Sequence, residues 1–171
     1  MKKIFLIIFI LFIFNNVQAN TNFAFINMDK IISTSKPGSF FLNQLQDLNN
    51  DNVAKFKKNE KVLKEREKKL ISQKNIISED KFNSEINNLK LDIKNYNDNR
   101  NKVMIEFNKL KIDNTNKFLK LTNSILTKYS DKNSISIIFQ KKNIIMGKTE
   151  FDITDKIIEI INKDIEEFRI K

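Results

Sequence analysis

The chain of 171 residues contains no cysteine and no histidine, and it has only two glycines and one proline. Without cysteine, no disulfide can stabilise the fold. Without histidine, the chain lacks the commonest general base and the commonest metal ligand. A phosphate-binding loop needs closely spaced glycines, which the sequence does not have. We therefore expect a protein that is not an enzyme and that uses no cofactor and no metal.

The few glycines and prolines are also unevenly placed, because residues 39–146 contain neither. These two residue types are the main interruptions of regular secondary structure, and a compact domain needs several of them in its turns. The sequence therefore predicts a long, nearly uninterrupted helical region in the middle of the chain.

The first residues have the pattern of a secretory signal. Lys2 and Lys3 precede an apolar run over residues 4–14, and residues 17–19 place small side chains where a signal peptidase cleaves. The run is about eleven residues long, whereas a membrane-spanning helix needs about 20. We therefore favour a signal over residues 1–19, cleaved between Ala19 and Asn20, over an uncleaved anchor. The mature protein is expected outside the cytoplasm.

The helical region contains two heptad patterns. In residues 39–77 only one of the two seam positions is consistently apolar, which is typical of a weak coiled coil. In residues 78–128 both seam positions are well occupied. The apolar seam residues are Leu42, Phe56, Leu63, Leu70 and Ile77 in the first pattern, and Phe82, Ile86, Leu89, Ile93, Tyr96, Val103, Phe107, Leu110 and Leu121 in the second.

A short connection at residues 75–80 separates the two patterns. Ser78 is placed to begin the second helix, with Glu79 and Asp80 in its first turn, where the helix dipole favours carboxylates. Two helices that each have one apolar stripe and a short connection fold back on each other. We therefore predict a projecting antiparallel hairpin arm over residues 39–128, roughly 60 Å long.

Short β segments flank the arm. Residues 23–28, 135–140 and 143–146 are predicted strands, with a tight turn at residues 141–142. Asp29 is expected to cap a short helix, Ser39 the first arm helix, and residues 152–155 a final amphipathic helix. Residues 20–38 and 129–171 would then form the body of the protein.

Such a body is too small to be stable alone, so we expect oligomerisation. The alternative is a monomer whose terminal helix covers the sheet. The apolar strand residues that we expect at the interface between chains are Phe23, Phe25, Ile135, Ile137, Phe139, Ile144 and Met146.

Positive charge is concentrated on the predicted arm. The formal net charge is +10, and residues 55–74 contain nine basic and only three acidic residues. Codon drift toward A and T would raise the lysine content of the whole chain, but it explains this cluster less well. Aromatic residues are not regularly interleaved with these lysines as single-strand binding would need, and a secreted protein is separated from nucleic acid. We therefore expect no physiological nucleic-acid partner.

The order of these features resembles the Skp/OmpH family of periplasmic chaperones. The resemblance rests on the signal, the first strand leading to Pro37 and Gly38, the charged hairpin, and the Asp-Ile-Thr-Asp sequence at residues 152–155 before the last helix. It implies a mainly α fold with a small β body, in which strands from three chains close a barrel. The arms would enclose a cavity that holds unfolded outer-membrane proteins without ATP.

For this family function we predict two groups of client-binding residues. The alternative for the basic group is a solvated helix face, and the alternative function is a secreted coiled-coil spacer or adaptor of the cell envelope. Weak contact with anionic lipid surfaces is also expected. The predicted client-binding residues are Lys55, Lys57, Lys58, Lys61, Lys64, Arg66, Lys68 and Lys69 on the arm, with Ile76, Ile77 and Phe82 near its tip.

Overall fold

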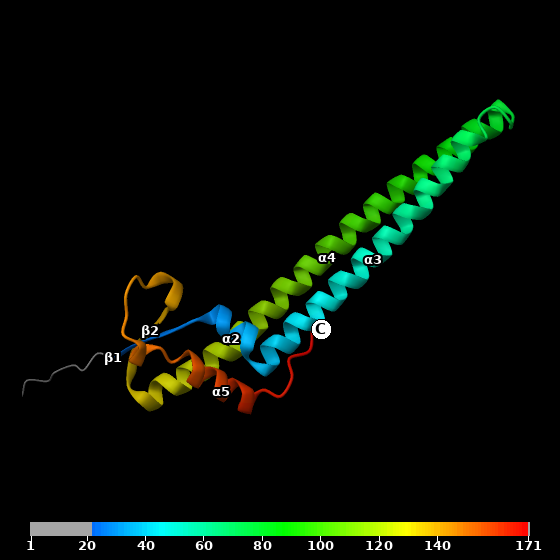
Figure 1. Cartoon of the computed structure of the whole chain (residues 1–171). Coiled ribbons are helices and arrows are strands. Elements are labelled where there is room, and N and C mark those ends of the chain that lie inside the picture. The colour runs from blue at the N-terminus through cyan, green and yellow to red at the C-terminus, as the bar shows by residue number, and fades with distance from the viewer. Residues whose placement is uncertain (1–21, 171) are drawn as a thin grey trace, which may run out of the picture.

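The computed structural model describes residues 22–170, and it consists of a long two-helix arm attached to a small body (Figure 1). The predicted signal sequence and its cleavage site at Ala19 and Asn20 lie outside the described residues. The elements are, in order, β1 (Asn22–Ile26), α2 (Met28–Thr34), α3 (Lys36–Ser72), α4 (Glu79–Asn133), β2 (Ile135–Gln140), two short 3-10 turns η1 (Lys141–Asn143) and η2 (Thr149–Phe151), and α5 (Thr154–Asp164).

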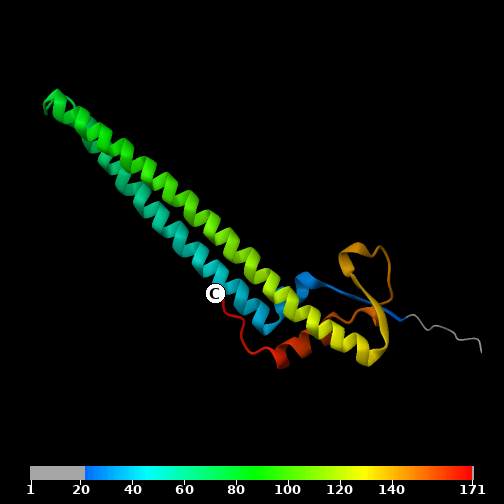
Figure 2. The same ribbon diagram turned by 180° about the vertical axis from the view of Figure 1, so that it is seen from behind.

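The arm consists of α3 and the first part of α4, which run side by side in opposite directions (Figures 1 and 2). The predicted helical hairpin is therefore confirmed. Ser78 is the N-cap of α4, with Glu79 and Asp80 in the first turn, as the sequence indicated. α4 is longer than predicted, because it continues through residues 129–133 into the body.

The start of the arm differs from the prediction. Ser35, not Ser39, is the N-cap of α3, and its Oγ accepts a hydrogen bond of 3.2 Å from the Gly38 N–H. Pro37 lies in the first turn of α3, where backbone N–H groups have no partner within the helix. Its lack of an N–H therefore costs no helical hydrogen bond. The predicted break over residues 35–38 is therefore a single residue, and α2 and α3 meet at a sharp corner.

The first strand is shorter than predicted. β1 ends at Ile26, and Asn27 caps α2 by accepting a hydrogen bond of 3.0 Å from the Lys30 N–H. Asp29, the predicted cap, lies in the first turn of α2 instead. Asn27 fits this role because its short side-chain carbonyl reaches a free N–H of the first turn.

The sheet has two parallel strands, β1 and β2, which the whole arm separates in sequence. The predicted strand over residues 143–146 is wrong for the single chain, because no strand forms there among residues 22–170. The free edge of β1 is partly taken by another segment, since the Ile153 N–H donates to the Phe25 carbonyl at 3.1 Å. Residues 144–148 instead form an irregular loop in which Ile145 and Met146 are 105% and 90% exposed.

The core lies between the inner face of the sheet, the root of the arm and α5. Ala24 and Ile26 of β1 pack into it, while Phe23, on the opposite face, is exposed. α5 contributes Ile157 and Ile161, both fully buried. The amphipathic terminal helix was predicted, and it covers one side of the body.

Three phenylalanines join the C-terminal segment to the root of the arm. The Phe168 ring meets Phe41 of α3 and Phe118 of α4 edge-on, with centroid distances of 5.4 and 5.5 Å. Gln44 holds the same segment, because its Nε2 donates to the Phe168 carbonyl at 2.8 Å and its Oε1 accepts from the Ile170 N–H at 3.2 Å. The C-terminal segment therefore turns back from α5 and fastens the two arm helices together (Figure 2).

Candidate functional site: the arm and the outer face of the body

The two arm helices contact each other through a narrow apolar seam. Leu70 of α3 and Leu89 of α4 are buried, and Phe56 and Tyr96 are half-buried. The Tyr96 hydroxyl donates to the Phe56 carbonyl at 3.3 Å, which links the helices near the middle of the arm. The heptad spacing of these residues is what places them on the facing sides.

Arg66 occupies one of the polar seam positions of α3. Its guanidinium forms an ion pair of 3.3 Å with Glu85 and another with Asp92, both on α4. Half-exposed pairs of this kind contribute little net stability, but a charged layer in a coiled coil favours one register. Of the predicted client-binding cations, Arg66 is thus the one placed between the helices. Arg100 of α4 likewise faces the seam, with its guanidinium 5.9 Å from the centre of the Phe56 ring.

The predicted basic residues other than Arg66 are all exposed. Lys57, Lys61, Lys64 and Lys68 are spaced by four, three and four residues, so they lie on one face of α3, turned away from the seam. We call these four the basic stripe. It is a continuous line of cations along the outer side of the arm.

Two members of the basic stripe have carboxylate neighbours. Lys64 lies 2.9 Å from Glu60, and Lys61 lies 3.8 Å from Glu65. The hydrogen bond and the charge of Lys64 lower the pKa of Glu60, and the same contact raises the pKa of Lys64. All of these groups are exposed to solvent, so the ion pairs do not cover the stripe.

The predicted apolar tip residues are split by the structure. Ile76 lies in the connection between α3 and α4 and is well exposed, whereas Ile77 and Phe82 are half-buried at the end of the seam. The structure therefore leaves Ile76 available at the tip and gives the other two a packing role.

The predicted oligomerisation residues also divide into two groups. Phe23, Ile137 and Phe139 are exposed on the outer face of the sheet, where the Phe23 and Phe139 rings lie 6.2 Å apart. Met146 is exposed in the loop that follows η1. By contrast, Phe25 is buried within the chain, and Ile135 and Ile144 are half-buried.

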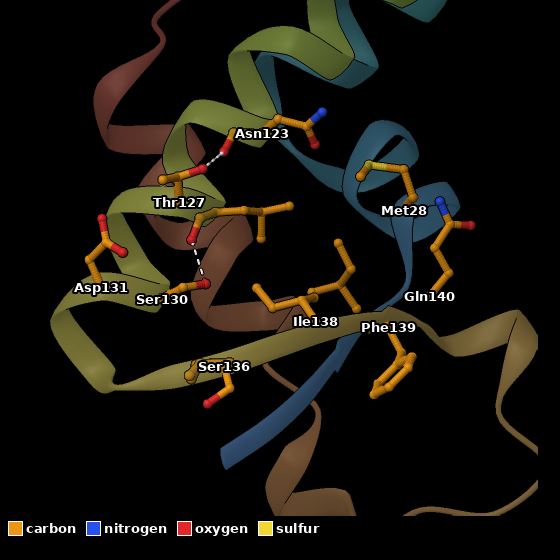
Figure 3. A pocket seen from close by; sticks show the side chains of 12 residues that line it. Met28, Asn123, Thr127, Ser130, Asp131, Ser136, Ile138, Phe139 and Gln140 are labelled. Atoms are coloured by element: carbon orange, nitrogen blue, oxygen red, sulfur yellow. Dashed lines mark hydrogen bonds between the residues drawn. The ribbon is translucent and has the colours of Figure 1, made fainter. Parts of the chain in front are cut away.

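A groove of about 620 Å³ lies between β2 and the end of α4 (Figure 3). Two of its hydroxyl groups are occupied within α4, because Ser130 donates to the Leu126 carbonyl at 2.9 Å and Thr127 to the Asn123 carbonyl at 3.0 Å. Residues 22–170 contain no cluster of acidic side chains that could hold a metal ion. The groove is lined mainly by apolar, hydroxyl and amide side chains, with Asp131 as its one acidic residue.

The Asp-Ile-Thr-Asp sequence joins the two separated parts of the body. Thr154 is buried, and its Oγ1 donates to Asp152 and accepts a hydrogen bond of 2.9 Å from the Asn27 N–H. Asp152 also pairs with Lys141 at 2.7 Å, and Asp155 pairs with Lys30 at 2.6 Å. Through these contacts, residues 152–155 connect the segment before the arm with the segment after it.

Replacing Asp152 with asparagine is expected to lower stability by about 1–2 kcal/mol at pH 7, because charged hydrogen bonds are lost. Burial acts to raise the pKa of Asp152, but the hydrogen bonds from Lys141 and Thr154 outweigh it and lower the pKa below its ordinary value. A lowered pKa stabilises the fold above the unfolded-state value of about 3.9, and the contribution disappears as the pH falls through the folded-state value.

Urea unfolding of wild type and Asp152→Asn between pH 7 and pH 3 tests this prediction. The stability difference between them should shrink in acid. Asp155→Asn is the matched control, because its ion pair is exposed and contributes at most about 1 kcal/mol. A difference for Asp152→Asn that stays constant down to pH 3 would contradict the assignment.

The fold defines a class of protein in which a long helical hairpin projects from a small β body. The described residues include no helix with the length and apolar character needed to cross a membrane. Residues 22–161 match the family described as outer membrane protein (OmpH-like). The chain therefore belongs to the OmpH-like family.

A solved structure has the same fold. It is the crystal structure of a candidate OmpH-like outer membrane chaperone from Caulobacter crescentus CB15, with a TM-score of 0.81, 13% sequence identity and 90% coverage of each chain. No curated protein matches the chain in sequence. At this low identity the similarity concerns the fold.

Proposed function

We propose that the mature protein is an ATP-independent periplasmic holdase. It binds unfolded outer-membrane β-barrel proteins in a cavity between the basic arms of a homotrimer and prevents their aggregation. The observation that carries the proposal is the arm itself, which holds a line of exposed lysines far from the body on a helix pair with little core.

Membership of the OmpH-like family supports a periplasmic chaperone role for this chain. The related crystal structure, described as that of a candidate OmpH-like outer membrane chaperone, has the same fold over 90% of each chain. The predicted secretory signal agrees with a location in the periplasm.

The body supports assembly into an oligomer. Phe23, Ile137 and Phe139 form an exposed apolar face, and the outer edge of β2 has no partner strand among residues 22–170. An open edge beside exposed apolar side chains favours pairing with another chain. The exposed Ile145 and Met146 would then have partners that a single chain does not supply.

The proposed mechanism depends on charge and distance. An unfolded β-barrel protein exposes alternating apolar strands that pair with one another and aggregate. Basic arms attract acidic clients from a distance, and an enclosed client cannot meet a second one. Many weak contacts hold the client without fixing its conformation, so release needs no ATP.

Light scattering tests the proposed function directly. A urea-unfolded outer-membrane β-barrel protein is diluted into buffer without ATP, in the presence of increasing amounts of the mature chain, residues 20–171. We expect scattering to be suppressed, with saturation near three chains per client. No suppression at any ratio would favour the envelope spacer instead.

Reversal of the basic stripe tests the role of charge in the same assay. Changing Lys57, Lys61, Lys64 and Lys68 to glutamate should weaken client binding at least roughly tenfold at low salt and remove most of its salt dependence. Changing the same residues to glutamine should have an intermediate effect. Wild-type binding by the glutamate variant would show that the lysines are only a solvated face.

A further inference from the structure

The C-terminal segment, residues 165–170, crosses the root of the arm after α5 ends at Asp164 (Figure 2). Phe168 is buried and Ile165 and Ile170 are half-buried against the core, whereas the residues between them are exposed. The family match covers residues 22–161, so this segment lies outside the matched part of the chain. We call residues 165–170 the C-terminal strap.

The strap is attached to the arm by few contacts. Among residues 22–170, both hydrogen bonds between the strap and α3 come from one side chain, that of Gln44, and Phe168 is the one buried side chain of the strap. Ordering six residues costs conformational entropy of the same order as the gain from one buried ring and two hydrogen bonds. The strap can therefore detach while the rest of the body stays folded.

The turns of α4 beside the strap are suited to bending. The buried Thr122 Oγ1 donates to the Phe118 carbonyl at 3.0 Å, and Asn114 Nδ2 donates to the Leu110 carbonyl at 2.8 Å. Polar side chains that bond a carbonyl one turn back weaken the helix locally and often bend it. Because α4 runs unbroken from the arm into the body, a bend between residues 114 and 122 would swing the arm relative to the body.

We propose that the C-terminal strap is a releasable clasp that holds the arm at one angle to the body. The Phe168 ring lies edge-on to Phe41 of α3 and Phe118 of α4, so it fixes both helices at the level of the turns that favour bending. The other end of the strap is anchored to the body by α5, whose Ile157 and Ile161 are fully buried. While the strap is docked, a bend in α4 would pull these three rings apart.

Detachment of the strap is expected to leave the two arm helices paired. The seam farther along the arm holds them without the strap, because Leu70 and Leu89 are buried near the tip and Tyr96 bonds to the Phe56 carbonyl. The arm would therefore swing as one unit. In the holdase proposed above, such a swing changes the width of the space between arms. This consequence rests on the proposed function, whereas the clasp itself is tested without a client.

Amide hydrogen exchange tests whether the strap detaches. The Ile170 N–H donates to Gln44 Oε1 in the strap, and Ile161, the same residue type, lies inside α5. We expect the Ile170 amide to exchange at least about a hundredfold faster than the Ile161 amide, because only local opening is needed to expose it. Equal protection of the two amides would make the strap a permanent part of the body and overturn the proposal.

The distance between the arm and the body tests whether the strap fixes the angle. The chain has no cysteine, so spin labels at Lys94→Cys on α4 and Lys156→Cys on α5 form a specific pair at exposed positions. Pulsed electron spin resonance measures the distribution of label distances, and dilution with unlabelled chain isolates the distances within one chain. Phe168→Ala removes the ring of the clasp, and Gln44→Ala removes its hydrogen bonds. Gln46→Ala is the matched control, because Gln46 is exposed on the same helix.

We expect the distance distribution to widen at least about twofold in Phe168→Ala and by less in Gln44→Ala, with unchanged helix content by circular dichroism. Gln46→Ala should keep the wild-type width. If Phe168→Ala loses helix content, Gln44→Ala decides, because it removes no buried ring.

Wild-type width in both clasp variants would overturn the proposal. A wild-type distribution already as wide as that of Phe168→Ala would overturn it as well, since the strap would then impose no restraint on the arm. Either result leaves the holdase function standing, because no client enters the measurement.

Discussion

Replacing Phe118 with alanine is expected to lower the free energy of unfolding by about 3–5 kcal/mol, the largest effect that we predict for a single side chain. The ring is fully buried and stacks on Phe41 at a centroid distance of 6.4 Å, with Phe168 edge-on to both. Its removal leaves a cavity at the point where the arm enters the body. For a chain of this size, the expected loss corresponds to a fall in melting temperature of roughly 10 °C.

Thermal unfolding of Phe118→Ala beside Phe40→Ala measures this effect. Phe40 lies next to Phe41 on α3 but is 36% exposed, so its replacement should cost clearly less, about 1–2 kcal/mol. Phe168→Ala separates the ring contacts from the helix packing, because it should also release the C-terminal segment to proteolysis. Equal melting temperatures for Phe118→Ala and Phe40→Ala would show that the trio does not hold the arm.

The arm could be predicted from the sequence because local patterns determine it. The absence of glycine and proline and the seven-residue spacing of Leu89, Tyr96 and Val103 define helices and their facing sides. Ser78 and the carboxylates after it define where the second helix begins. These signals need no knowledge of distant parts of the chain.

The body was predicted less completely because its contacts are between distant segments. Residues 143–146 have the composition of a strand, but residues 141–143 form the 3-10 turn η1 in place of a tight hairpin turn, and the outer edge of β2 stays without a partner strand in one chain. The helix cap at Ser35 was not predicted because Pro37 and Gly38 together are typical of an interruption between helices. Proline is nevertheless well accommodated in the first turn of a helix. Both errors arise where a local sequence pattern is compatible with two different backbone structures.

The candidate site shows the same division. The exposure of the basic stripe follows from its spacing, but the interhelix role of Arg66 depends on Glu85 and Asp92 of the other helix.

The chain's two glycines give a second large and unusual prediction, because Gly38→Ala should destabilise the protein although it lies in a helix. Alanine is normally favoured over glycine in helices by about 1 kcal/mol. A Cβ at Gly38, however, would lie 2.2 Å from the Ile32 carbonyl oxygen and 2.6 Å from Ser35 Oγ. The first contact is with backbone, so no change of rotamer relieves it, and α2 must move away from α3. We expect a net loss of about 2–3 kcal/mol, in the upper range for overpacked sites.

Gly147→Ala is the matched control, because it makes the same chemical change in the loop after η1. There the added Cβ would lie 3.0 Å from the end of the Phe25 ring, a side chain that can shift, and 3.6 Å from Ile144. The smaller unfolded-state entropy of alanine offsets that contact, so the variant should remain within about 0.5 kcal/mol of wild type.

Urea unfolding of the two variants compares their free energies of unfolding directly. If Gly38→Ala were as stable as Gly147→Ala, the corner between α2 and α3 would be looser than its hydrogen bond from Gly38 to Ser35 indicates. Loss of stability in Gly38→Ala alone would mean that this glycine is required for the space it leaves, since its backbone does not adopt a left-handed conformation.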